Sequence, residues 1–550
     1  MHSESMNDDL LARAESARGF RRFRLFFALS GPGWLQAAVT LGGGSLVGAL
    51  YLGVVGGYGL LWVQPLAMLG GVIMLGAIAY VTLSTGERPF LTVRDHVSPV
   101  LAWGWLLATV VADSVFCMAQ FSLGTAAVQQ NLGASAVPAM GITSVLFVVS
   151  IALIWAYESG DRWAAYVEAF LKLLVAVVVI SFFGVVVVLI ANGAVAPGRV
   201  LTGFIPNPRS LFEPSEALRT AVAATGPAAE WWTDYIKSSQ RDIIVGAFGA
   251  AVGINMTFLL PYTLLKRGWG RKHRRLARYD LALGLFIPYV LATTFLVVAS
   301  SSQFHASSAD VLDASGTPYA SVEGAYNQIV DARIGATIPS VDGTPASLEE
   351  LRSQLPLPER KVAAMLVRRD AGSLATALKP FLGTFSHPIF GIGVLAMAIS
   401  TMLVHMMMNG YAVAEAFGKH GNRMVFMAGA LIPAIGGLFS PYIWKGASRA
   451  ALAVPASVIA TTLLPVAYLT FLLLMNSKLI RSSAPYRNRQ LVNVLLVVAT
   501  GLATFGSAWV LSNSGTPGKI GIAGLVALAA IGVGGFVRRN RAGRNEGMKE

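Results

Sequence analysis

The residues Leu41-Gly42-Gly43-Gly44-Ser45 lie in the middle of a long apolar segment that extends from residue 26 to residue 55. A segment of this length and polarity can cross a lipid bilayer. Three successive glycines, which are poor helix formers, occupy the depth at which no water replaces lost backbone hydrogen bonds. The stretch therefore predicts a broken first helix with a binding site near the middle of the membrane. The alternative is that these small residues only let a second helix approach closely.

The composition of the whole chain indicates a membrane protein with many spans. Of its 550 residues, 55% are hydrophobic and 13% are charged, and the mean hydropathy is +0.61. These values exclude an ordinary soluble domain. The net charge is +14, but Lys and Arg gather in short loops between apolar segments, where they encode orientation, so nucleic acid is not an expected partner. A single cysteine, Cys117, excludes an internal disulfide and a cysteine-cluster metal site.

Twelve segments are long and apolar enough to span a bilayer. They lie near residues 26–55, 58–83, 100–127, 137–157, 164–192, 243–265, 279–301, 384–412, 423–439, 450–475, 490–511 and 519–537. If the polar N-terminal segment 1–25 is cytoplasmic, alternating crossings place the basic loops 266–278 and 478–489 and the basic tail 538–550 on the same side, as the positive-inside rule requires. We therefore expect a multi-pass protein of the plasma (inner) membrane, surrounded by lipid, with both termini in the cytoplasm.

Two longer connections are expected on the external side. The first, residues 193–242, contains a segment at 215–237 that predicts an amphipathic helix, with aromatic side chains at the membrane surface from Trp231, Trp232 and Tyr235. The second, residues 302–380, is polar, and a helical pattern begins near Ser347. This second loop is either a lid over a transport path or an inert cap.

Several short motifs occur in a fixed order along the chain. They are Gly31-Pro32-Gly33-Trp34-Leu35, Gly57-Tyr58-Gly59-Leu60-Leu61-Trp62, Thr85-Gly86-Glu87, Ala112-Asp113, Leu464-Pro465 and Met475-Asn476-Ser477-Lys478-Leu479. Together they resemble the Nramp family of proton-coupled divalent-metal transporters. The resemblance covers roughly residues 26–300 and 384–535.

The resemblance implies an all-α integral membrane protein with the LeuT-like inverted-repeat fold, in which the first and sixth of about twelve helices are broken. The first repeat would then occupy residues 26–192 and the second residues 243–475. Two further spans would lie within residues 476–537.

The chain departs from the family in both broken helices. The family's first span carries Asp-Pro-Gly-Asn, whose carboxylate and amide bind the metal, whereas the matching residues here are Gly42, Gly43, Gly44 and Ser45. The family's sixth span carries Met-Pro-His, and the matching residues here are Ile254, Asn255, Met256 and Thr257. By resemblance these eight residues line the substrate site, and only Met256 is left to act as a soft ligand. The second acid of the family's third span falls near Phe116.

The loss of the carboxylate has a chemical consequence. Mn²⁺, Mg²⁺ and Ca²⁺ are hard ions that rely on charged or carbonyl oxygens. A site of glycine carbonyls, hydroxyls and an amide has no formal charge, and it suits a monovalent cation or a polar organic solute better than a bare divalent ion. Bound water can retain part of the shell of a hydrated divalent ion. Alternatively, Asn255 and Thr257 only form hydrogen bonds to a neighbouring helix.

Few ionisable residues fall within the spans, where each is costly. Asp113 matches the acid of the family's third span and is the expected proton carrier, unless a hydrogen bond gives it a purely structural role. His405 lies among methionines, which suits a soft cation such as Cu⁺, although a run of methionines more often serves packing. Glu168 and Lys172 have the spacing of an intrahelical ion pair, and Glu415 is expected to be solvated.

The sequence thus predicts a secondary transporter of Nramp type that carries a divalent metal ion together with protons. The first alternative is a transporter of a small organic or monovalent solute on the same fold. The second is a membrane sensor that transports nothing. Because no nucleophile–base arrangement or metal-ligand spacing is found, neither an enzyme nor a cofactor is expected.

Overall fold

The computed structural model describes residues 10–337, 345–443, 453–483 and 488–546. Regular secondary structure in these ranges is helical, apart from one isolated bridge between Leu312 and Pro318. Within these described ranges, ten helical stretches are long and apolar enough to cross a membrane, and two shorter apolar helices, Arg423–Leu438 and Thr461–Met475, occupy the ninth and tenth predicted positions. The expected all-helical architecture is therefore confirmed.

The first half of the chain follows the predicted order of spans, with one change at its start. Its helices are α2 (Gly19–Leu29), α3 (Pro32–Thr40), α4 (Gly43–Gly56), α5 (Val63–Thr85), α6 (Pro89–His96), α7 (Pro99–Ala126), α8 (Ala139–Tyr157) and α9 (Asp161–Ala191). The prediction that the first span begins at residue 26 is wrong, because α2 ends at Leu29 and Ser30 is extended. Pro32, which lacks an N–H, opens the span proper as the first residue of α3.

The second half repeats this pattern and adds two helices at the end. Its main helices are α12 (Ala229–Ala251), α13 (Ile254–Lys266), α14 (Arg274–Asp280), α15 (Ile287–Phe304), α21 (Ser386–Ala416), α22 (Arg423–Leu438), α24 (Ala453–Met475), α25 (Lys478–Ser483), α26 (Arg489–Ser512) and α27 (Gly515–Glu546). A π-helical segment, Leu281–Phe286, joins α14 to α15.

Both predicted helix breaks are present. The first span stops at Thr40 and resumes at Gly43, so that only Leu41 and Gly42 leave the helix, and Gly42 is extended. The sixth span stops at Ala251 and resumes at Ile254, after an extended Gly253. The unwound part of the first span is thus shorter than the glycine run, because Gly43 and Gly44 already belong to the first turn of α4.

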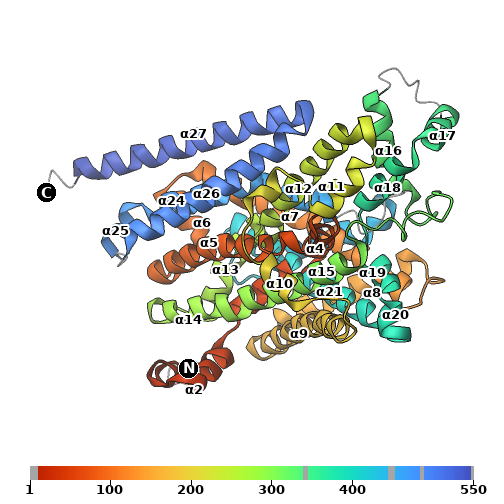
Figure 1. The fold of residues 1–550 in the computed structure, drawn as a ribbon. Coiled ribbons are helices and arrows are strands. Elements are labelled where there is room, and N and C mark those ends of the chain that lie inside the picture. The colour runs from red at the N-terminus through yellow and green to blue at the C-terminus, as the bar shows by residue number, and fades with distance from the viewer. Residues whose placement is uncertain (1–9, 338–344, 444–452, 484–487, 547–550) are drawn as a thin grey trace.

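The N-terminal and C-terminal ends lie on one side of the molecule, opposite α16 (Glu323–Thr337), α17 (Pro345–Gln354) and α18 (Leu357–Leu366) (Figure 1). We call these two sides the termini side and the cap side. This arrangement agrees with the even number of crossings expected from the sequence. Which side faces the cytoplasm remains a prediction from the positive-inside rule.

The connection 302–380 folds into a helical cap made of α16, α17, α18 and α19 (Ala371–Ala377). Helix was expected only from residue 347 onward, so α16 was missed. Ion pairs hold the cap together: Arg352 Nη2 lies 2.7 Å from Asp331 Oδ2, and Arg333 Nε lies 2.7 Å from Glu359 Oε2. The cap is therefore a packed part of the molecule.

The amphipathic helix expected at residues 215–237 is divided between a short helix, α11 (Glu216–Ala223), and the first turns of α12. The prediction that Trp232 lies at the membrane surface is wrong. Its side chain is fully buried, and Nε1 donates a hydrogen bond of 3.0 Å to Glu359 Oε2 of the cap. The indole is buried because α18 packs over this part of the chain.

Candidate functional site

A small cavity lies where the two broken helices meet. Its volume is about 20 Å³, which is room for roughly one water molecule. Its walls come from α3, α4, α7, α12, α13 and α21, and the lining residues include Thr40, Gly42, Gly44, Ser45, Phe116, Gln120, Asn255, Met256, Thr401 and His405. Backbone that is not helical thus lies beside a polar hollow, as expected for interrupted membrane helices.

Three of the predicted site residues, Gly43, Ile254 and Thr257, are absent from this lining. The N–H of Gly43 donates to Oε1 of Gln120 at 3.1 Å. The hydroxyl of Thr257 donates to the Ile254 carbonyl and accepts a 2.9 Å hydrogen bond from Nε1 of Trp105. For Thr257, the alternative role of binding a neighbouring helix therefore fits the geometry better than contact with a substrate.

The backbone carbonyls at the ends of α3 and α12 already accept hydrogen bonds from side-chain hydroxyls. Ser45 Oγ donates to the Thr40 carbonyl at 2.5 Å, and Thr40 Oγ1 donates to the Ala251 carbonyl at 2.8 Å. Thr401 Oγ1 donates to the Ala38 carbonyl at 2.9 Å. Part of the acceptor capacity that carbonyl oxygens at the breaks offer to a hard cation is therefore already used by hydroxyl groups.

Asp113, His405 and Asn255 form a buried polar cluster beside the cavity. His405 Nδ1 lies 2.7 Å from Asp113 Oδ1, and Asn255 Nδ2 donates to the same oxygen at 3.0 Å. All three side chains are almost fully buried, and Asp113 Oδ2 has no hydrogen-bond partner. Because Oδ1 is the acceptor of both contacts, we assign the proton to Nδ1 of His405, which leaves the lone pair on Nε2.

Sequence reasoning missed the pairing of His405 with Asp113. The ring of Phe116 stacks on the His405 ring with centroids 5.3 Å apart and an interplanar angle of 5°. Met406, Met407 and Met408 are fully buried and do not line the cavity, so this run of methionines serves packing. The sequence did show a histidine, His405, within an apolar span, which indicates a polar partner. It could not show that this partner is Asp113, because Asp113 lies on a different helix.

A large vestibule of about 1250 Å³ opens between the helices and the cap. It is lined by α4, α12, the start of α21 and the inner face of the cap, and its residues include Val47, Tyr51, Tyr235, Asp242, Arg368 and Asp370. The guanidinium of Arg368 lies 4.7 Å from the centroid of the Tyr51 ring. Val47 and Tyr51 belong to the same helix as Gly44 and Ser45, so α4 contributes residues to both the vestibule and the central cavity.

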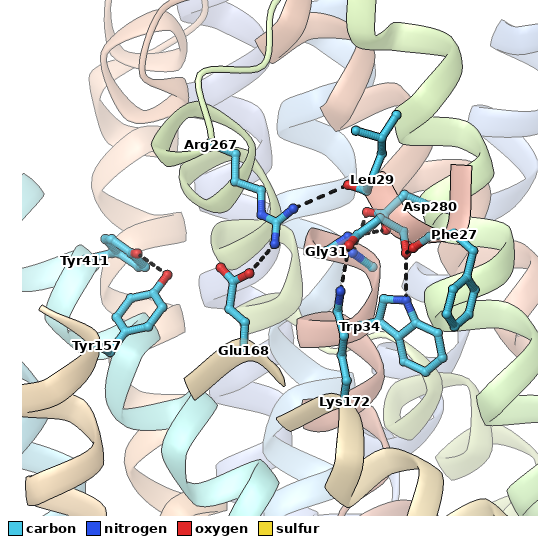
Figure 2. Close-up of polar contacts among 12 residues, drawn as sticks. Phe27, Leu29, Gly31, Trp34, Tyr157, Glu168, Lys172, Arg267, Asp280 and Tyr411 are labelled. Carbon is cyan, nitrogen blue, oxygen red and sulfur yellow. Dashed lines mark hydrogen bonds and ion pairs between the residues drawn. The ribbon is translucent and has the colours of Figure 1, made fainter. Parts of the chain in front are cut away.

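On the termini side, Asp280 holds the start of α3 (Figure 2). Its carboxylate accepts hydrogen bonds from the N–H groups of Gly31 at 2.8 Å and Gly33 at 2.6 Å. A Cβ atom at Gly33 would lie 2.2 Å from the Asp280 carbonyl oxygen, and one at Gly31 would lie 2.1 Å from the Arg267 guanidinium carbon. The two glycines of the Gly-Pro-Gly motif therefore permit this close approach.

Two cationic side chains, Arg267 and Lys172, also join segments on the termini side (Figure 2). Arg267 forms an ion pair with Glu168, and Lys172 Nζ donates to the Ser30 carbonyl at 2.8 Å. The predicted pair between Glu168 and Lys172 is therefore wrong. Each of these side chains reaches a different segment, because the loop after α13 and the turn before α3 pack against α9.

The prediction that Glu415 is solvated is also wrong. Its side chain is buried, and it accepts a hydrogen bond of 2.8 Å from the hydroxyl of Tyr262. His420 Nε2 lies 3.0 Å away and Arg88 Nη1 lies 3.7 Å away. Tyr262 belongs to α13, the second half of the broken sixth span, and Glu415 belongs to α21. Their hydrogen bond therefore connects these two helices on the termini side.

Within the described residues, no group of three or more His, Cys, Asp or Glu side chains is placed to hold a metal ion. The central cavity instead offers one imidazole, one thioether, amides and hydroxyls. These are neutral donors and acceptors around a hollow of about 20 Å³.

Comparisons with known proteins agree with this architecture. A family model described as natural resistance-associated macrophage protein-like matches residues 33–330 and 361–513. Natural resistance-associated macrophage protein 1 of Bubalus bubalis is 25% identical over 257 residues, which are 46% of this chain and 44% of that protein. The match thus spans less than half the length of this curated relative.

Two solved structures share the fold. The manganese transporter of Eremococcus coleocola, in complex with an aromatic bis-isothiourea substituted compound, aligns with a TM-score of 0.55 and 15% identity, over 95% of this chain and 96% of that one. A mutant of the same transporter aligns with a TM-score of 0.55 and 14% identity over the same shares. The all-α, LeuT-like architecture is therefore established, and the chain is a multi-pass integral membrane protein. Because the family model covers most of its length, the protein belongs to the Nramp family.

Proposed function

We propose that this protein is a secondary active transporter of Nramp type that carries a metal ion. The observation that carries the proposal is the pair of broken helices around a buried cavity, with an open vestibule on the cap side and a closed termini side. Alternating access requires these parts: a central site and two approaches that open in turn. The solved relatives of the same fold include a manganese transporter, which supports a metal as the cargo.

Proton coupling is part of the proposal. Asp113 is a membrane-buried acid that contacts both His405 and Asn255, a residue that lines the cavity. An ionisable group at this depth is costly and is retained where it moves charge. Asp113 is therefore the proposed group on the proton pathway.

Neutral lining around the cavity supports a second candidate, a transporter of a monovalent cation or of a small organic solute. Among the described residues that line it, none has an acidic side chain, and the carbonyls of Thr40 and Ala251 at the helix breaks already accept hydrogen bonds. Removing the hydration shell of a hard divalent ion without an anionic ligand is costly.

Uptake into proteoliposomes tests the proposal. Mn²⁺ uptake by the parent protein is measured with and without an inward proton gradient, beside a Gly42→Asp variant. A Cβ at Gly42 would lie 2.8 Å from Thr401 Cγ2, so Thr401→Ala is added to make room. The double variant Gly42→Asn and Thr401→Ala is the control, because it has the same shape without the charge.

Gradient-dependent uptake by the parent supports a proton-coupled metal transporter. Uptake by the Gly42→Asp variant but not by the parent or the Asn control means that divalent transport was lost with the carboxylate. If the parent moves no metal ion or solute, and a partner binds its cap, the protein is a sensor and the proposed transport is refuted.

A further inference from the structure

We propose that the central cavity binds a soft monovalent cation, Cu⁺, through Nε2 of His405 and the thioether of Met256, with Asp113 as the positioning residue. The inference rests on the proposed function and names its cargo class. It is carried by three observations: the orientation of His405, the identity of the atoms in the cavity wall, and the size of the hollow.

His405 is held through one ring nitrogen. Its Nδ1 lies 2.7 Å from Asp113 Oδ1 and 3.2 Å from Asn255 Nδ2, and His405 itself lines the cavity. Because both contacts are made by Nδ1, Nε2 is the nitrogen left available to a ligand in the cavity. A histidine whose other nitrogen donates to a carboxylate is oriented as metal-binding histidines are, and the carboxylate makes the free nitrogen more basic.

The stacked ring of Phe116 fixes the remaining freedom of the imidazole. The His405 side chain is almost fully buried, and its contact with Asp113 and the stacked ring hold the imidazole in one orientation. Little reorganisation is therefore needed for Nε2 to bind a ligand.

Met256 supplies the second donor. It lies in the first turn of α13, next to the helix break, and is the one methionine in the cavity wall. Thioether sulfur binds soft ions and is a poor ligand for Mg²⁺, Ca²⁺ or Mn²⁺, whereas imidazole accepts borderline and soft metals. A nitrogen and a sulfur in the wall of one small hollow therefore select Cu⁺, which is stable with few ligands.

The charge and size of the cavity agree with this choice. The hollow of about 20 Å³ has room for one dehydrated ion but not for an ion with its first shell of waters. Asp113 Oδ1 contacts two cavity-lining residues, His405 and Asn255. One carboxylate next to the cavity wall suits a cation with one positive charge better than a cation with two.

Cys117 is the other soft atom close by, and it provides a check. Its Sγ lies 4.0 Å from the Met402 carbonyl, and the residue does not line the cavity. Cys117→Ala is therefore expected to leave Cu⁺ affinity unchanged.

Cu⁺ binding is measured with the full-length protein in lipid nanodiscs, under ascorbate, by competition with a chromogenic Cu⁺ chelator. The parent should bind one equivalent. Met256→Leu, which keeps the volume but removes the sulfur, and His405→Gln, which removes the imidazole, should each weaken the affinity by at least tenfold. Met407→Leu is the matched control: it removes a fully buried sulfur outside the cavity wall and should change nothing.

X-ray absorption of the Cu⁺-loaded protein gives a readout independent of affinity and of transport. The parent should show one sulfur and one nitrogen neighbour, and Met256→Leu should lose the sulfur signal alone. Asp113→Asn should weaken Cu⁺ binding by about 10- to 100-fold while both neighbours remain, as expected for a residue that acts through a ligand.

Several results would overturn the inference. Absence of Cu⁺ binding by the folded parent refutes it, as does equal affinity in the parent and the two ligand variants. If the parent carries Mn²⁺ in proteoliposomes but binds no Cu⁺, the cargo class is wrong while metal transport stands. If Cu⁺ binds as predicted but no cation is transported, the site is confirmed and the proposed transport fails.

Discussion

The closure of the termini side depends on one carboxylate, and its removal should shift the protein toward an open state. Asp280 accepts the N–H groups of Gly31 and Gly33 at 2.8 and 2.6 Å. Asp280→Asn keeps the shape but replaces one acceptor oxygen by a donor, so one buried glycine N–H is left without a partner. An unpaired buried donor costs about 1–3 kcal/mol. In the open state these N–H groups reach water, so the cost falls on the closed state alone.

A differential cost of this size corresponds to roughly a 5- to 150-fold change in the equilibrium between the two states. The shift can be followed through the accessibility of α3. Gln36 is fully buried on this helix and its amide makes no hydrogen bond, so Gln36→Cys in a Cys117→Ala background provides a reporter. Its rate of labelling by a membrane-impermeant thiol reagent should rise with the open population.

The control is Asp242→Asn, which removes a carboxylate from the vestibule on the cap side. It should leave the labelling of Gln36→Cys unchanged, and both variants should elute as folded protein. Equal labelling rates with aspartate and asparagine at position 280 would refute the role assigned to this carboxylate.

Three further predictions follow from local geometry. Thr257→Val should lower the free energy of unfolding by about 1–3 kcal/mol, because the buried Trp105 indole N–H loses its acceptor. The same variant should leave Cu⁺ affinity unchanged. Loss of Cu⁺ binding without loss of stability would mean that Thr257 contacts the ligand. Arg369→Gln should destabilise the cap, because the two hydrogen bonds of 2.8 Å from the Arg369 guanidinium to the Asp310 carboxylate are lost. Limited proteolysis within residues 302–380 should then be faster than in the parent. Lys361→Gln, at an exposed position of the cap, is the control. Burial lowers the pKa of His305, whose Nδ1 lies 2.9 Å from the Val54 carbonyl oxygen. Near the ordinary histidine pKa of 6.5, the unfolded chain therefore binds more protons at this position than the folded protein does. The free energy of unfolding should fall as the pH drops through this range. The apparent Tm should drop less in His305→Gln than in the parent between pH 7.5 and pH 5.5, about one unit on either side of that range, and equal drops would contradict the assignment.

The order of the spans and the break in the first of them were predictable from the sequence, and the break in the sixth span was implied by the resemblance to the Nramp family. Hydropathy over about 20 residues is a local property, and the glycine run that begins at Gly42 weakens a helix wherever it occurs. The positive-inside rule likewise uses only the positions of Lys and Arg along the chain. For the same reason the start of the first span was misplaced, because the apolar end of α2, residues 25–29, and the apolar α3 look continuous until the turn at Ser30 is seen.

The partners of the buried polar groups were decided only by the tertiary structure. Asp113 and His405 are 292 residues apart, and Asp280 and Gly31 are 249 residues apart. Glu168 binds Arg267 rather than the nearer Lys172, because a charge buried in a membrane pairs with whichever group the packing of helices brings to it. The sequence by itself therefore located the broken backbone, whereas the packing of α7 against α21 determined which side chains face the cavity between the breaks.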